Sequence, residues 1–285
     1  MGKFINPFTD FGFKKIFGQE ISKELLIDFL NDLLVGERVI TDLTFLNNEQ
    51  LPELKDERGV IYDIYCVTDT GEKIIVEMQN KSQVYFKERA LYYLSKAILR
   101  QGEVGHEWKF DIKAVYGVFF MNFILTDNVQ LRTDVILVDR ETGKMFSDKL
   151  RPIFIALPQF KKEETECQND FERWIYILKN METLKRMPFK ARKAVFKKLE
   201  DIADVSSLSR EDRERYENSV DAYRTNLCVM DAAKLEGREE GREEGREEGR
   251  EEATLAIARN LKAQGISTDI IAQSTQLSLE VIENL

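Results

Sequence analysis

Hydrophobic residues follow two different spacings in the first 160 positions of the chain. In SKELLIDFLNDLL (22–34) they recur every three or four residues, which predicts a helix that ends at Gly36. A second amphipathic helix is predicted for QVYFKERALYYLSKAILRQG (83–102), and a shorter one for TDFGFKKIFG (9–18), with Thr9 or Asp10 as its cap. Five runs are rich in β-branched and aromatic residues and are predicted to be strands: VITDLTFL (39–46), GVIYDIYCV (59–67), EKIIVEMQ (72–79), IKAVYGVFFM (112–121) and LRTDVILVD (131–139). This mixture predicts an α/β fold in which one mixed sheet is flanked by helices.

The pattern changes after Pro158, where the predicted strands stop. The later segments with helical spacing are DFERWIYILKNMETL (170–184), PFKARKAVFKKLEDIA (188–203) and SREDRERYENSVDAYRTNL (209–227). Pro188 is expected in the first turn of its helix, where a missing N–H costs little. We therefore expect a core at 1–160 and an all-helical extension, packed on that core, at 161–235.

A four-residue Gly-Arg-Glu-Glu repeat occupies residues 236–252. It offers nothing apolar to bury, so we interpret it as a solvated, marginally helical spacer, with a coiled-coil seam as the alternative. Residues 253–285 form a predicted small module of three short helices, in which Gly265 ends the first helix and Ser267 and Ser278 cap the next two. The helix order is similar to a helix-turn-helix, but the last segment, LEVIENL, carries two glutamates and no Lys or Arg, so a partner-binding or self-association module, for example in a homodimer, is favoured.

The net charge and the small numbers of histidine and cysteine residues limit the kinds of site that the chain can form. The formal net charge is −9, of which −6 belongs to residues 236–285, whereas residues 173–198 carry nine Lys or Arg against one acid. The single histidine, His106, excludes histidine-rich metal sites, and we expect it in a solvated loop. Three widely spaced cysteines, no secretory signal and no apolar run of membrane-spanning length predict a cytoplasmic protein with no membrane partner.

The candidate chemistry lies in the predicted hairpin VIYDIYCVTDTGEKIIVEMQ (60–79). If its turn is centred on Thr70, Asp63 lies directly opposite Glu77, and Gln79 shares their face. A register shift of one residue would separate the two acids. Two adjacent carboxylates need a proton or a divalent cation between them, and hard oxygen ligands suit Mg²⁺ or Mn²⁺. The alternative is a hairpin whose end is merely hydrated.

Four motifs, in this order, carry a family resemblance: TDFGFKKIFG, YDIYCV, IIVEMQ and FKERALYYLSKAI. Over roughly residues 4–235 the chain resembles the Rpn family of recombination-promoting nucleases and putative transposases, which belongs to the PD-(D/E)XK nuclease superfamily. The resemblance implies a restriction-endonuclease-like core and Mg²⁺-dependent cleavage of DNA phosphodiesters. It assigns catalysis to Asp63, Glu77 and Gln79, with the metal held by Asp63 and Glu77, and accessory positions to Asp10, Arg89 and Tyr92.

Gln79 stands where the superfamily usually has a lysine, so it can orient water but brings no charge. Lys81, two residues further on, either supplies that charge or is simply solvated. The residues expected to contact the DNA backbone are Lys190, Arg192, Lys193, Lys197 and Lys198, with an all-round solvated helix as the alternative. The sequence thus predicts a metal-dependent DNA endonuclease linked to recombination or mobile elements. The alternative is a nuclease fold with weak or no catalysis that binds DNA or protein.

Overall fold

The computed structural model describes residues 2–50, 59–102, 109–125 and 130–285. His106 lies outside the described residues. The chain divides into two compact units, Met1–Tyr223 and Arg224–Leu285. All three cysteines are free thiols, and none of the described helices is both long and apolar enough to cross a membrane.

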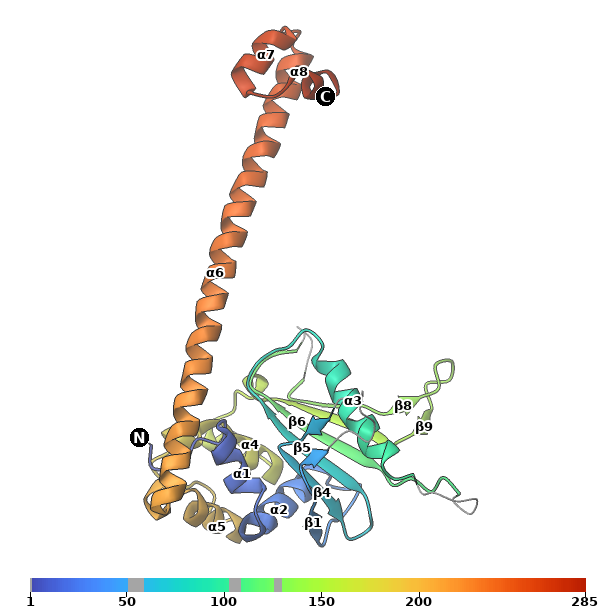
Figure 1. Cartoon of the computed structure of the whole chain (residues 1–285), viewed down its shortest axis with the longest axis vertical. Helices are drawn as coiled ribbons and strands as arrows, with labels where there is room; N and C mark the ends of the chain where they lie inside the picture. Colours follow the sequence, from blue (N-terminus) through green and yellow to red (C-terminus); the bar gives the residue numbers. More distant parts are fainter. Residues whose placement is uncertain (1, 51–58, 103–108, 126–129) are drawn as a thin grey trace. The chain divides into compact units, whose positions relative to one another are not determined.

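The first unit is built on a six-stranded mixed sheet with the order β1-β4-β5-β6-β10-β7 (Figure 1). The strands of this sheet are β1 (Leu43–Phe45), β4 (Ile64–Thr68), β5 (Lys73–Gln79), β6 (Val115–Met121), β7 (Arg132–Asp134) and β10 (Leu150–Ala156). Two small two-stranded sheets are formed by β2 (Glu49–Gln50) with β3 (Val60–Ile61), and by β8 (Leu137–Val138) with β9 (Met145–Ser147). Strands β5, β6 and β10 run parallel, while β4 pairs antiparallel with β5, so the predicted mixed α/β sheet is confirmed.

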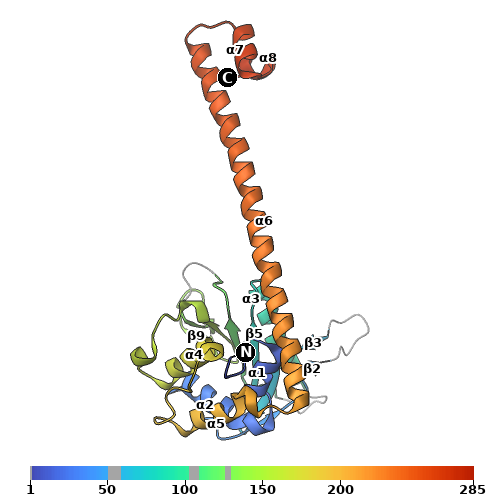
Figure 2. The same cartoon turned by 90° about the vertical axis from the view of Figure 1, so that its left-hand side faces the viewer.

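Helices cover both faces of this sheet (Figures 1 and 2). One face packs against α1 (Asp10–Phe17), α2 (Lys23–Leu33), α4 (Asp170–Asn180) and α5 (Ala194–Ala203), and the other against α3 (Phe86–Leu99). Along β5 the side chains alternate between the two cores: Ile74 and Val76 face the four-helix side, and Ile75 faces α3. Because Glu77 continues the alternation of Ile75, its side chain belongs to the α3 face.

The close contact between α3 and the sheet depends on Gly117 in β6. A Cβ atom at this position would lie 2.5 Å from Leu94 Cδ1 and 2.6 Å from Phe119 Cε2. Both of those side chains are buried, so they have little room to move aside. The glycine therefore lets α3 approach the sheet closely enough to reach the candidate site.

Four element predictions for the first unit were wrong. The strand predicted for 131–139 is divided between β7 and β8, which belong to different sheets. The strand predicted for 59–67 is broken into β3 and β4, with Asp63 just before β4. No strand was predicted for 150–156, where β10 lies inside the sheet. This strand contains Pro152, and proline is usually confined to edge strands because it has no N–H to donate. The helix predicted from Pro188 begins only at Ala194, because Phe189 has a left-handed backbone (φ 60°) that a helix cannot accommodate.

The helix α6 (Arg210–Ala263) includes the Gly-Arg-Glu-Glu repeat, where every side chain is exposed. The two helices that were predicted on either side of the repeat are therefore parts of one helix. Gly265 follows with a left-handed φ of 80°. Ser267 and Ser278 occupy the positions before α7 (Thr268–Thr275) and α8 (Leu279–Glu283), but only Ser278 caps its helix through its hydroxyl, which accepts from Val281 N–H. Within the second unit a small core is formed by Ala258, Ile271 and Ile282.

Candidate active site

The β4–β5 hairpin has the register that the sequence predicts. Ile64 pairs with Val76 and Tyr65 with Ile75, so the next position brings Asp63 opposite Glu77. Gly71 adopts a left-handed backbone (φ 94°) in the turn, which fixes this register. Asp63 and Glu77 therefore share one face at the carboxyl end of β5.

Two reciprocal hydrogen bonds fix these carboxylates. The Asp63 backbone N–H donates to Glu77 Oε1 at 3.0 Å, and the Met78 backbone N–H donates to Asp63 Oδ2 at 2.8 Å. Each side chain is thus held by the backbone of the opposite strand. The second oxygen of each carboxylate, Oδ1 of Asp63 and Oε2 of Glu77, accepts no hydrogen bond from the part of the chain that the structure describes. Asp63 Oδ1 therefore remains for a ligand, whereas Glu77 Oε2 also faces Arg89 Nη2 at 3.8 Å.

Burial makes this pair costly to ionise. Glu77 is only 4 % exposed, and this desolvation, together with the charge of Asp63, raises its pKa to about 8. Desolvation also raises the pKa of Asp63, against its hydrogen bond from Met78. Two acids that repel each other in a poorly solvated place form an environment in which a cation is favourable.

Helix α3 brings Arg89 to this pair. Its Nη2 lies 3.8 Å from Glu77 Oε2, and its Nη1 lies 3.5 Å from Gln79 Oε1 and 3.1 Å from Gln83 Oε1. The other end of the Gln79 amide donates from Nε2 to the Lys81 carbonyl at 3.2 Å. The structure therefore brings Gln79 and Arg89 to the carboxylates. Tyr92, one turn after Arg89, lines a neighbouring groove with it, and its ring lies 5.8 Å from Lys96 Nζ.

Helix α1 contributes two charges from the other side. Asp10 and Lys14 form an ion pair of 2.7 Å between Oδ1 and Nζ. The charge of Lys14 lowers the pKa of both Asp63 and Glu77, while that of Asp10 raises the pKa of Asp63. Lys14 was missed by the sequence analysis, although its i, i+4 spacing from Asp10 was a usable signal. It places near the acids the positive charge that Gln79 lacks.

The first turns of α6 hold the segment that leads into α1. The Asn6 backbone N–H donates to Tyr216 Oη at 2.8 Å, and the Phe11 backbone N–H donates to Ser219 Oγ at 3.1 Å. Lys15 and Asp212 add an ion pair of 2.7 Å. The Thr9 hydroxyl caps α1 by accepting from Gly12 N–H at 3.0 Å, as predicted. These contacts, which lie within the first unit, fix the position of α1 and hence of Lys14.

The donor set fits a magnesium-type ion only in part. Among the described residues there is no group of three or more His, Cys, Asp or Glu side chains that could hold a metal. Magnesium is, however, often held by one or two carboxylates together with water and substrate phosphates. Asp63 and Glu77 meet that requirement, and burial, which raises the pKa of both, makes their charged forms costly unless a cation compensates them. Asp10 is engaged by Lys14.

The basic residues expected to contact DNA lie in and before α5. Three of them are engaged by carboxylates: Lys190 by Glu200, Lys193 by Asp28 and Asp32, and Lys198 by Glu24. Arg192 and Lys197 are exposed. Most of this positive charge is thus neutralised within the first unit.

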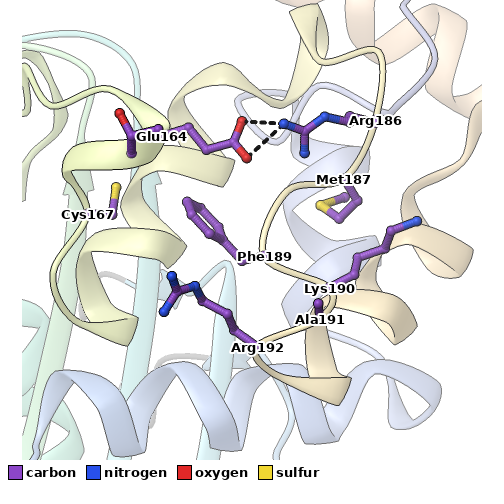
Figure 3. A pocket seen from close by; sticks show the side chains of 9 residues that line it. Glu164, Cys167, Arg186, Met187, Phe189, Lys190, Ala191 and Arg192 are labelled. Atoms are coloured by element: carbon purple, nitrogen blue, oxygen red, sulfur yellow. Dashed lines mark hydrogen bonds and ion pairs between the residues drawn. The ribbon is translucent and has the colours of Figure 1, made fainter.

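Lys190 and Arg192 also line a pocket of about 490 Å³, shown in Figure 3. Arg186 crosses its rim, where its Nη2 lies 2.9 and 3.0 Å from the two carboxylate oxygens of Glu164. The remaining lining residues are Thr165, Cys167, Met187, Phe189 and Ala191. This pocket shares no lining residue with the Asp63–Glu77 pair and holds no second acid to suit a cation.

Comparison with known proteins identifies a family but no individual relative. Neither a curated protein nor a solved structure was found to match the chain. A family model described as PD-(D/E)XK nuclease family transposase matches residues 7–233, which include the whole β4–β5 hairpin and both helices that reach it. The chain therefore belongs to the PD-(D/E)XK nuclease family transposases.

Proposed function

We propose that this protein is a metal-dependent endonuclease that hydrolyses DNA phosphodiester bonds, in a role linked to recombination or mobile elements. The observation that supports this most directly is the Asp63–Glu77 pair, in which each carboxylate is fixed by the opposite strand and has one oxygen that accepts no hydrogen bond from the described residues. Membership of the nuclease family supports the same activity.

Each side chain around the pair has a defined role in this proposal. Asp63 and Glu77 would hold Mg²⁺ or Mn²⁺, and the bound ion would lower the pKa of a water and polarise a phosphate oxygen. Gln79 orients the attacking water through its amide, because it offers both an acceptor and a donor. Lys14 and Arg89 bring positive charge near the pair and would attract the scissile phosphate, whose negative charge grows as the water attacks.

Plasmid nicking tests this proposal. Wild-type protein with Mg²⁺ or Mn²⁺ should convert supercoiled plasmid to nicked or linear DNA, and Glu77→Ala should abolish the conversion. Glu49→Ala, which removes an exposed acid of β2 outside the pair, is a suitable control and should retain activity. Equal activity in wild type and Glu77→Ala would refute the assignment.

A second candidate function is a DNA- or protein-binding platform with weak catalysis. It is favoured by the glutamine at position 79 and by the small acidic ligand set. In that case the protein should bind DNA with the same affinity in EDTA and in Mg²⁺, and purified protein should leave the plasmid supercoiled in both conditions.

A further inference from the structure

A second feature adjoins the candidate active site on the α3 side. A groove with a volume of about 1070 Å³ lies between the β3 strand and the beginning of α3. The lining residues that matter here are Ile61, Val84, Tyr85, Arg89, Tyr92 and Tyr93. The groove therefore combines three tyrosine rings, two aliphatic side chains and one guanidinium group.

Its hydrophobic residues are unusually exposed. Val84 is 90 % exposed, Tyr85 73 % and Ile61 66 %. Such apolar surface carries a cost in water, and clusters of it typically mark binding sites. The same groove includes Glu88, which balances Arg89, so the groove is not a basic patch that would follow a run of phosphates. The tyrosine rings that line the groove are the feature that determines which ligand it binds.

Arg89 belongs to both the groove and the candidate active site. Its guanidinium lies 4.9 Å from the Tyr93 ring, and its Nη2 lies 3.8 Å from Glu77 Oε2. A ligand that enters the groove and reaches Arg89 is thus directly beside the carboxylates. A nucleotide has the required form, since its flat base and its phosphate are joined through one sugar.

We propose that the groove binds one nucleobase that is out of the helical stack, next to the phosphodiester that the carboxylates attack. Tyr85, the more exposed ring, supplies a face on which a base stacks, Tyr92 lines the same groove, and Arg89 meets the adjoining phosphate. A base inside a continuous duplex cannot reach these rings, so the preferred substrate is DNA with an unpaired nucleotide: a bulge, a flap or a gap. This inference rests on the proposed nuclease function for the identity of the phosphate, but its binding test does not depend on catalysis.

The test compares two fluorescent DNAs of equal length, one fully paired and one with a single-nucleotide bulge, by anisotropy in EDTA. Wild-type protein should bind the bulged DNA more tightly, and Tyr85→Ala with Tyr92→Ala should remove that preference. One base stacked on a tyrosine corresponds to a change in Kd of roughly 5- to 150-fold. Phe146→Ala, which removes an exposed aromatic ring of β9 outside the groove, is the matched control and should keep the preference.

Equal affinity for the two DNAs, or a preference that survives loss of both tyrosines, would overturn the inference. Cleavage is measured separately with Mg²⁺. If the bulge preference follows the tyrosines while neither DNA is cut, the base-binding groove stands and the nuclease function fails. If both DNAs are cut at equal rates and bound equally, the nuclease function stands and the groove inference fails.

Discussion

Replacing Glu77 with Gln should stabilise the metal-free protein above neutral pH, because the native pair is costly to ionise. The pKa of Glu77 is raised from 4.5 to about 8, by desolvation first and by Asp63 second. A carboxyl whose pKa is raised on folding gives a stability that is fully present below pH 4.5 and is lost as the pH rises through about 8. The wild type should therefore weaken with rising pH, while Glu77→Gln should change much less.

The expected size follows from this shift. One pKa unit is worth about 1.36 kcal/mol, so the free energy of unfolding of wild type should fall by roughly 3 kcal/mol relative to Glu77→Gln between pH 5 and pH 8. Urea unfolding at each pH measures it, with the emission of Trp174, which is buried in the core of the first unit, as the signal. Mn²⁺ at a hundred times its Kd should then add about 2.7 kcal/mol to wild type at pH 8 and far less to the variant.

Asp134→Asn is a control of opposite sign. Burial alone would raise the pKa of Asp134, but its hydrogen bonds from Arg151 and Arg132 outweigh this and lower it. Its stability contribution is therefore present at neutral pH and lost in acid, so Asp134→Asn should destabilise the protein at pH 8 and leave the Mn²⁺ response intact. The reasoning is refuted if Glu77→Gln has the pH dependence of wild type, or if Mn²⁺ stabilises both equally.

Three further predictions follow from other parts of the chain. Lys14→Met should lower the cleavage rate on plasmid about 10- to 100-fold, because Lys14 supplies positive charge near the acids. The midpoint of urea unfolding should change little, because the Lys14 side chain is partly exposed; an unchanged cleavage rate would exclude the proposed role. Gly117→Ala should reduce the free energy of unfolding by about 1–3 kcal/mol, because its Cβ would collide with Leu94 and Phe119; unaltered stability in urea unfolding would contradict the tight packing. We propose that the second unit mediates self-association, because it has a very small core and leaves Ile257 and Ile270 exposed; the full chain should then be a dimer in light scattering, and deletion of residues 236–285 should leave a monomer, whereas an unchanged oligomeric state would remove this unit from self-association.

The main geometry of the candidate site could be predicted from the sequence because it depends on local rules. A two-residue period places Asp63, Glu77 and Gln79 on one face, and the turn at Gly71 fixes the register between them. The same period separates Ile75 from Ile74 and Val76, and thereby assigns the two cores.

The parts that escaped prediction depend on long-range contacts. The spacing of Lys14 from Asp10 links these two residues, but the influence of Lys14 on Asp63 arises only when α1 packs against the sheet. Strand β10 was not predicted because it contains Pro152, whose missing N–H argues against a strand by local rules, although this sheet tolerates it. The neutralisation of Lys190, Lys193 and Lys198 depends on acids that lie 10 to 174 residues away.

The contacts of Tyr216 and Ser219 with the chain's first dozen residues have a consequence for synthesis in the cell. A growing polypeptide contains both acids of the hairpin early, yet it lacks the helix that seats α1 until more than two hundred residues have been translated. An incomplete chain, whether stalled on the ribosome or cut short by a nonsense codon, therefore carries the carboxylates without a firmly placed Lys14. The last step in placing α1 therefore waits for the segment that carries Tyr216 and Ser219.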